Sequence, residues 1–197
     1  MSHGFRSGFV AILGRPNAGK STLLNALVGR KVAIVSDKPQ TTRNRIQGIL
    51  NRQDAQIVLV DTPGIHKPNT VLGRQMMGEV AQAFEGVDIV CLIVDSAESF
   101  GPRDRFALAQ VSARGGRGPS FLLLNKIDRI PKAKLLPLID AYSKAHEFKE
   151  AIPISARTGD GLPLLLEKLI EHLPEGQPYF PPEQFTDQPE QNGRAHV

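Results

Sequence analysis

The sequence predicts an α/β fold: a mainly parallel six-stranded sheet with one antiparallel strand at its edge and helices on both faces. Short apolar runs suited to buried strands alternate with helical stretches along most of the chain, which is typical of strand–helix–strand units. Two of these runs, residues 45–50 and 56–60, are joined only by a short polar turn, so they predict a hairpin that supplies the antiparallel strand. Ligands of such sheets bind at the carboxyl ends of the strands, where each polar motif described below is expected to lie.

Apolar periodicity and the turn residues between the runs define the individual elements. The predicted strands are residues 8–13, 45–50, 56–60, 88–94, 120–124 and 151–154, and the predicted helices are 22–28, 71–85, 103–114, 132–146 and 161–172. The last helix has a clear apolar stripe, formed by Leu162, Leu165, Leu166, Leu169, Ile170 and Leu173. We expect Asp160 to cap this helix and Pro163 to lie in its first turn.

Composition indicates one globular domain, residues 5–174, and an extended tail, residues 175–197, that is rich in Pro, Gln and Glu. The net charge of +4 suits an anionic ligand or RNA, although an ordinary solvated surface explains it equally well.

The single cysteine, Cys91, lies in an apolar run and predicts packing, not a disulfide or a cysteine-based zinc site. No apolar run approaches the roughly 18–20 residues of a membrane span. The N-terminus also lacks the apolar core of a signal peptide, so we expect a cytoplasmic protein.

A phosphate-binding loop is predicted between the first strand and the first helix. Residues 14–22 fit the pattern G-x-x-x-x-G-K-[ST]. Its glycines let the backbone approach phosphate oxygens, and the loop N–H groups and the helix N-terminus favour an anion. In this pattern Lys20 reaches the β- and γ-phosphates and the Ser21 hydroxyl binds Mg²⁺. The nucleotide contacts expected from the loop are Gly14, Asn17, Ala18, Gly19, Lys20, Ser21 and Thr22. The alternative is an ordinary strand-to-helix turn.

A second polar motif, Asp61-Thr-Pro-Gly64, follows the predicted strand 56–60. A carboxylate at Asp61 can hold the Mg²⁺ shell, and the Gly64 N–H can meet the γ-phosphate. By itself the tetrapeptide fits a turn that ends a strand; the phosphate-binding loop upstream favours the nucleotide site.

The motif Asn125-Lys-Ile-Asp128 follows the strand 120–124 and indicates selection of guanine. A carboxylate at Asp128 can accept hydrogen bonds from the guanine N1–H and from its exocyclic amine, whereas adenine lacks this pair of donors. Sites built on such hydrogen bonds reject the wrong ligand by roughly 10⁴–10⁵. Asn125 can connect loops and meet the base edge, and the Lys126 stem can lie over the ring. A capped turn with solvated charges is the alternative.

Ser155, Ala156 and Arg157 follow the last predicted strand. Their backbone can meet the guanine O6. The tripeptide is weak by itself, and its order and position in the chain are what favour this role.

These motifs stand in the order of the Ras-like GTPases, and the chain resembles the bacterial Era family over about residues 5–190. The residues that carry the resemblance are those of the phosphate-binding loop, Gln40-Thr-Thr-Arg43, Asp61-Thr-Pro-Gly-Ile-His66 and Pro174-Glu-Gly-Gln-Pro-Tyr179. The resemblance implies a Ras-like P-loop GTPase that binds GTP or GDP with Mg²⁺ and hydrolyses GTP to GDP and phosphate. It would act as a nucleotide switch in assembly of the small ribosomal subunit.

The resemblance also implies roles for residues of the switch loops. Thr42, with Thr41 as the alternative, would join the Mg²⁺ shell; both could instead simply cap turns. Ile65 stands where a Ras-type enzyme has a water-orienting glutamine. Relatives with such a replacement use a monovalent cation, here K⁺, and Asn17 matches the asparagine that holds it; Asn17 could alternatively only bond the loop backbone. His66 fits a switch residue better than a base.

Partners are implied only by the resemblance. In the Era family a linker like residues 174–197 leads to an RNA-binding KH domain, and no KH-like pattern follows it here. We therefore expect a truncated or naturally short chain whose contact with small-subunit RNA is weak. The resemblance further implies a monomer and, as a property of the family, peripheral membrane association. Two other classes stay open: a nucleotide-gated binding module with negligible hydrolysis without a partner, and an ATP-dependent kinase.

Overall fold

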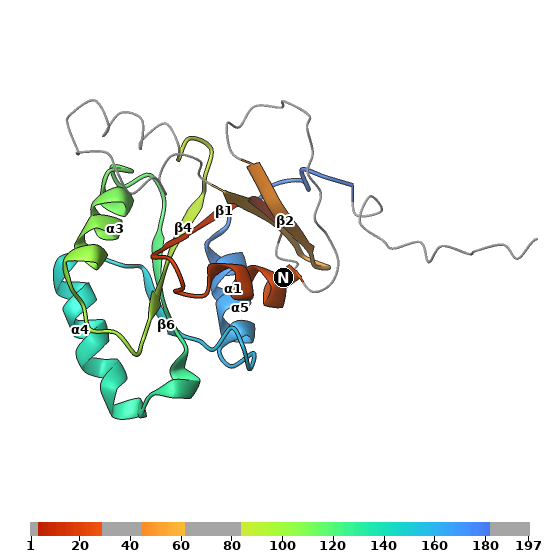
Figure 1. The fold of residues 1–197 in the computed structure, drawn as a ribbon. Helices are drawn as coiled ribbons and strands as arrows, with labels where there is room; N and C mark the ends of the chain where they lie inside the picture. Colours follow the sequence, from red (N-terminus) through yellow and green to blue (C-terminus); the bar gives the residue numbers. More distant parts are fainter. Residues whose placement is uncertain (1–3, 29–44, 62–83, 182–197) are drawn as a thin grey trace, which may run out of the picture.

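The computed structural model describes residues 4–28, 45–61 and 84–181, and within them six strands form one sheet (Figure 1). The strand order is β2-β3-β1-β4-β5-β6. The strands are β1 (Arg6–Gly14), β2 (Arg45–Asn51), β3 (Ala55–Asp61), β4 (Ile89–Asp95), β5 (Ser120–Asn125) and β6 (Glu150–Pro153). Strand β2 pairs antiparallel with β3 at the sheet edge, and the other pairs are parallel. The predicted sheet is confirmed.

Helices cover both faces of this sheet, as predicted. Figure 1 shows α3 (Pro102–Ser112) and α4 (Leu135–Ala145) side by side, apart from α1 (Lys20–Val28) and α5 (Leu162–His172). Strand β4 packs against both pairs, because Ile89, Cys91 and Ile93 join the apolar cluster of α1 and α5, whereas Val90, Leu92 and Val94 join that of α3 and α4. A strand that is buried on both faces reads as a continuous apolar run, which is why the sequence revealed it. Burial also raises the pKa of the Cys91 thiol to about 12, as expected for a packing residue.

Two expectations about helices were wrong in detail. The predicted helix 132–146 is a 3₁₀ turn, η2 (Lys132–Lys134), followed by α4. Pro137 explains the late start of α4, because proline lacks an N–H and is tolerated only in the first helical turn. Asp160 does not cap α5: the N-cap is Gly161 in a left-handed conformation, and the Asp160 carboxylate accepts a hydrogen bond from Thr158 instead. Residues 71–83 of another predicted helix lie outside the described residues.

The first part of the predicted tail lies against the amino ends of β1 and β3. Ser7 N–H donates to the Pro174 carbonyl, and Gly176 N–H donates to that of Phe5. The fully buried Gln56 binds Phe180 twice: its Oε1 accepts from the Phe180 N–H at 3.0 Å, and its Nε2 donates to the Phe180 carbonyl at 2.8 Å. Residues 182–197 lie outside the described part of the chain.

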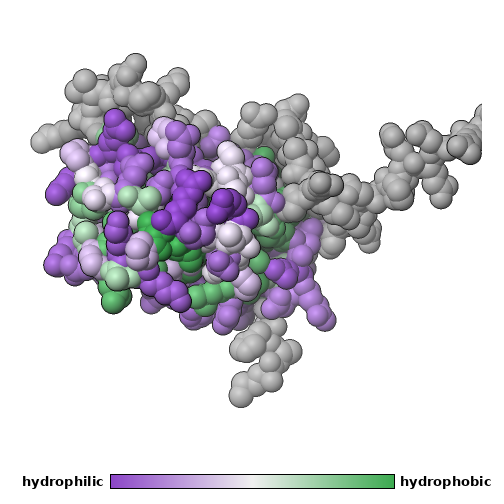
Figure 2. Space-filling view, turned by 60° about the horizontal axis from the view of Figure 1, so that its bottom comes forward, coloured by the Kyte–Doolittle hydropathy of each residue, from purple (hydrophilic) through white to green (hydrophobic). Residues whose placement is uncertain are grey.

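The polar motifs lie at the other edge of the sheet, where the parallel strands have their carboxyl ends. Strands β3, β1, β4 and β5 are consecutive neighbours, and their last residues are Asp61, Gly14, Asp95 and Asn125. Because all four run parallel, these residues meet at one edge of the sheet. Figure 2 looks toward the lower edge of Figure 1 and shows that hydrophilic residues predominate over the described part of this face.

Candidate nucleotide site

The loop between β1 and α1 has the backbone shape of an anion cradle. Asn17 and Gly19 both have positive φ, at 64° and 103°, and the Ala18 N–H closes a turn onto the Arg15 carbonyl at 3.2 Å. A Cβ at Gly19 would overlap the Asn125 amide, and one at Gly14 would overlap the Ile93 carbonyl. Both glycines are therefore also required by packing against neighbouring strands, in addition to the close phosphate approach that the sequence suggested.

Lys20 folds back over this loop. Its Nζ donates to the Gly14 carbonyl at 2.5 Å and to the Arg15 carbonyl at 3.0 Å. Burial lowers the pKa of the Lys20 ammonium, and the nearby Asp61 carboxylate partly opposes that shift. A half-buried ammonium over the loop that precedes the N-terminus of α1 fits a phosphate ligand.

Ser21 and Asp61 supply a donor set that suits Mg²⁺. Ser21 lies in the exposed first turn of α1, and Asp61 ends β3, the parallel neighbour of β1. Mg²⁺ is bound through one or two carboxylates together with hydroxyl, water and phosphate oxygens. Among the described residues, no group of three or more His, Cys, Asp or Glu side chains could hold a metal by itself. A nucleotide-bound Mg²⁺ needs no such group, so the residues present fit it.

Asn125 connects the three loops that meet at the base side of the site. Its side chain is buried, its Nδ2 donates to the Ala18 carbonyl at 2.8 Å, and its Oδ1 accepts from the Ala156 N–H at 2.9 Å. The structure thus supports the predicted loop-connecting role of Asn125. It also shows that one backbone N–H of the tripeptide expected to meet the guanine O6, that of Ala156, already has a partner.

Lys126 itself has a left-handed backbone conformation, with φ at 66°. Its side chain reaches back to the phosphate loop. Its Nζ donates to the Asn17 carbonyl at 2.7 Å and pairs with Asp95 Oδ2 at 2.6 Å. Sequence reasoning missed Asp95. The available signal was its position: Asp95 ends β4 directly beside Asn125 in the register of β4 and β5.

Asp128 presents a carboxylate that is held on both oxygens. Oδ1 accepts from the buried Ser155 hydroxyl at 2.7 Å, and Oδ2 accepts from Arg157 Nη2 at 2.7 Å. The Ser155 hydrogen bond lowers the pKa of Asp128, and Arg157 acts in the same direction. The group is therefore a carboxylate at neutral pH, as guanine recognition requires.

A cavity of about 120 Å³ lies at this point, and its lining combines the predicted base site with two residues of the phosphate loop. It is lined by Gly19, Thr22, Asn125, Lys126, Asp128, Arg129, Ser155, Ala156 and Arg157. Arg129 is the one lining residue that the sequence did not single out; its position beside Asp128 on the 3₁₀ turn η1 (Ile127–Arg129) was the available signal.

Arg15 anchors the phosphate loop to the far side of the sheet, which sequence reasoning also missed. Its Nη2 lies 2.5 Å from Glu98 Oε2, and its Nη1 lies 3.5 Å from both oxygens of the buried Asp104. Asp104 in turn accepts from the Gly101 N–H at 2.9 Å at the start of α3. Arg15 and Asp104 therefore connect the phosphate loop to the start of α3.

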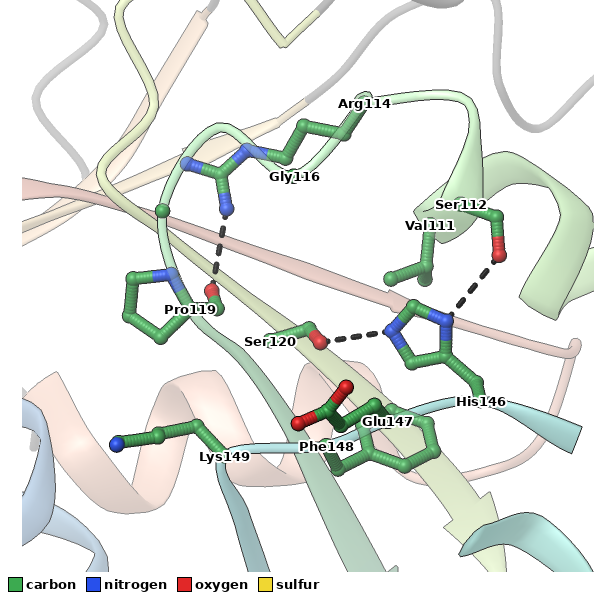
Figure 3. A pocket seen from close by; sticks show the side chains of 11 residues that line it. Val111, Ser112, Arg114, Gly116, Pro119, Ser120, His146, Glu147, Phe148 and Lys149 are labelled. Carbon is green, nitrogen blue, oxygen red and sulfur yellow. Dashed lines mark hydrogen bonds between the residues drawn. The ribbon is translucent and has the colours of Figure 1, made fainter. Parts of the chain in front are cut away.

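A larger cavity, about 570 Å³, lies away from these motifs at the amino ends of β5 and β6 (Figure 3). His146 spans part of it, with Ser112 Oγ 3.2 Å from Nδ1 and Ser120 Oγ 2.8 Å from Nε2. The buried Arg114 on its margin is used structurally, donating to the carbonyls of Val87, Asp88 and Pro119. The chemistry of a nucleotide site is therefore in the smaller cavity.

Several predicted site residues lie outside the described residues: Thr41, Thr42, Gly64, Ile65 and His66. The roles expected of them remain predictions. In the described part of the chain, no helix has the length and apolarity needed to cross a membrane.

Comparison with known sequences gives the same picture as the geometry. The sequence model of a family described as "50S ribosome-binding GTPase" matches residues 9–126. A GTPase Era from Syntrophus aciditrophicus is 52% identical over 193 residues, covering 98% of this chain and 62% of the relative. A GTPase Era from Ruminiclostridium cellulolyticum is 46% identical over 186 residues, covering 94% of this chain and 62% of the relative. The chain thus spans about 62% of the length of these curated relatives.

Solved structures agree in fold. A crystal structure of Era in complex with MgGDPNP and nucleotides 1506–1542 of 16S ribosomal RNA superposes with a TM-score of 0.72 at 43% identity, over 94% of this chain and 63% of that one. The structure of Aquifex aeolicus Era bound to GDP and AlF₄⁻ gives the same TM-score, identity and coverage.

Proposed function

Because this chain belongs to the family of 50S ribosome-binding GTPases and, within it, to the Era GTPases, we propose that it binds GTP with Mg²⁺ and hydrolyses it to GDP and phosphate. The observation that carries the proposal is the Asn125 side chain, which hydrogen-bonds the phosphate loop at Ala18 and the base loop at Ala156. One buried amide thus holds the two halves of a nucleotide site in register.

Guanine is selected by Asp128. Ser155 orients one carboxylate oxygen, and the carboxylate accepts from the N1–H and the amino group of the base. Adenine offers no such donors and would leave a carboxylate unpaired, which a hydrogen-bonding site penalises heavily.

Hydrolysis depends mainly on positioning and charge stabilisation. Lys20 and the loop N–H groups stabilise charge on the β- and γ-phosphates while water attacks the γ-phosphorus and the bond to the bridging oxygen breaks. Ser21, Asp61 and Thr42 hold Mg²⁺, which neutralises developing charge when it is bound. The Gly64 N–H meets the γ-phosphate. We expect a slow intrinsic rate, on the order of 10⁻⁴–10⁻³ s⁻¹.

Because the Ile65 side chain has no polar group to orient water, Asn17 would hold a potassium ion, which would supply additional positive charge beside the phosphates. In support of this role, Asn17 is exposed, its backbone is left-handed, and its carbonyl accepts a hydrogen bond from Lys126 Nζ.

The biological output we propose is a nucleotide switch acting on the small ribosomal subunit. One solved Era structure contains a segment of 16S ribosomal RNA together with MgGDPNP, which supports RNA as the partner. Residues 1–197 carry a net charge of +4 and no tryptophan, so by themselves they should contact RNA weakly, without sequence preference and with strong salt dependence. We propose a cytoplasmic monomer.

Single-turnover hydrolysis of GTP by the purified chain tests this function. Phosphate release that depends on Mg²⁺ and is competed by GDP but not by ADP supports a GTPase. Tight GTP binding without phosphate release over many hours would favour a nucleotide-gated binding module, which the hydrophobic Ile65 makes the main rival. Competition by ADP would instead favour an ATP-dependent enzyme.

A further inference from the structure

We propose that Arg157 gates entry of the base: its guanidinium and the guanine ring compete for the same carboxylate of Asp128, so that Arg157 limits how fast nucleotide binds. The inference rests on the proposed guanine-nucleotide function and adds to it a residue that controls nucleotide entry.

The geometry places Arg157 on the base-recognition atoms. Arg157 Nη2 lies 2.7 Å from Asp128 Oδ2, while the buried Ser155 hydroxyl takes Oδ1. Both Asp128 and Arg157 line the cavity of about 120 Å³. A base that donates to Asp128 from within this cavity therefore competes with Arg157 for the same carboxylate.

The chemistry of the two competitors is alike. The N1–H, C2 and amino group of guanine form a planar guanidine unit whose two N–H bonds point the same way. An arginine guanidinium offers the same planar donor edge, which is why arginine pairs so well with carboxylates. Oδ1 of Asp128 already accepts from Ser155 and Oδ2 from Arg157, so the base competes with Arg157 at Oδ2 and its binding requires that this pair opens.

Exposure sets the size of the effect and makes opening easy. The Arg157 side chain is 67% exposed, whereas that of Asp128 is 11% exposed, so Arg157 can swing into solvent while Asp128 stays in place. Solvent-exposed ion pairs shift an equilibrium by about 1.4- to 5-fold. The Arg157–Asp128 pair must open before the base docks, and it is absent from the bound complex. Loss of the pair should therefore raise the association rate by this factor and leave the dissociation rate unchanged.

Stopped-flow binding of a fluorescent GDP analogue to the full chain tests the gate. We expect R157A and R157Q to bind about 1.4- to 5-fold faster than the wild type with the same dissociation rate. R157K, which keeps the charge, should stay near the wild type. The gain of R157A over the wild type should shrink as salt rises from about 50 mM to about 1 M, because salt weakens the pair that is removed.

R129A is the matched control. Arg129 lines the same cavity, so this variant removes an equal charge from the rim but keeps the Arg157–Asp128 pair. Loss of a positive charge alone slows the approach of an anionic nucleotide, so R129A should not bind faster.

The outcomes distinguish failure of the Arg157 gate from failure of the proposed guanine-nucleotide binding. An unchanged association rate in R157A would mean that Arg157 does not limit entry, and faster dissociation would mean that Arg157 holds the bound base; either result would overturn the gate. If the wild-type chain binds no guanine nucleotide, the proposed function fails and the gate with it. If the wild type binds GDP and D128N loses it, the base site stands whatever R157A shows.

Discussion

The Nδ2 of Asn125 lies 2.8 Å from the carbonyl oxygen of Ala18, so the end of β5 is hydrogen-bonded directly to the phosphate-binding loop. Because Asn125 is only 2% exposed, this bond is shielded from water. The proposed base site and the proposed phosphate loop therefore share one structural element, and damage to Asn125 should affect both.

Asn125→Ala tests this shared element. The substitution leaves the Ala18 carbonyl and the Ala156 N–H without their partner, and each buried unsatisfied group costs about 1–3 kcal/mol. We expect a lower free energy of unfolding in urea without nucleotide and GDP affinity reduced by at least about tenfold, or ~1.4 kcal/mol. Asn125→Asp is the companion variant, since it keeps an acceptor for Ala156 but turns an acceptor toward Ala18. If both variants bind GDP like the wild type, Asn125 does not hold the site together.

Lys20→Ala should nearly abolish hydrolysis. Without the ammonium, developing charge on the β- and γ-phosphates loses its nearest cation. Single-turnover GTP hydrolysis measures the loss, and circular dichroism should show a native fold because the hydrogen bonds of Lys20 to described residues go to carbonyls of its own loop. Turnover within about threefold of the wild type, ~0.65 kcal/mol in the barrier, would mean that the loop does not cradle the reacting phosphates.

Asn17→Ala tests the monovalent cation. We expect the wild type to hydrolyse GTP faster in K⁺ than in Na⁺ at equal ionic strength, and the variant to lose that difference while it still binds GDP. Equal rates of the wild type in both salts would mean that K⁺ does not stimulate hydrolysis. Full K⁺ stimulation in the variant would mean that Asn17 does not hold the ion.

His146 should make stability depend on pH, independently of the nucleotide site. Burial lowers the pKa of His146 from its usual 6.5, while Glu147 opposes the shift. The folded chain therefore resists protonation that the unfolded chain accepts near pH 6.5, so stability is full above that pH and falls as the pH decreases. Urea unfolding between about pH 8 and pH 5 should show this fall in the wild type and a smaller one in H146Q, which can still bond Ser112 and Ser120. Parallel curves for the two proteins would assign the pH dependence to other groups.

Local pattern was enough to predict the sheet and much of the site. Apolar runs such as residues 89–94 are buried on both faces, and the phosphate loop, Asn125 and Asp128 each lie at or after the end of a strand whose direction fixes their meeting point. These features depend on neighbours in sequence or on the parallel topology, and both are visible in one chain.

The features that were missed depend on partners far apart in the chain. Lys126 pairs with Asp95 and Arg15 with Glu98, and no periodicity joins these positions. The fixed position of Phe180 likewise depends on Gln56, 124 residues away. The error at Asp160 has a local origin instead: Thr158, two residues away, donates to its carboxylate, and the next residue, Gly161, takes the cap position.

Guanine selection by Asp128 is tested most directly by comparing the wild type with Asp128→Asn in calorimetric titrations with GDP, ADP and XDP. A guanine site built on the Asp128 carboxylate predicts that the wild type prefers GDP over ADP by orders of magnitude. The variant should lose GDP affinity and gain XDP affinity, because the new amide donates where xanthine offers a carbonyl. A folded Asp128→Asn chain that binds GDP as tightly as the wild type would contradict the claim.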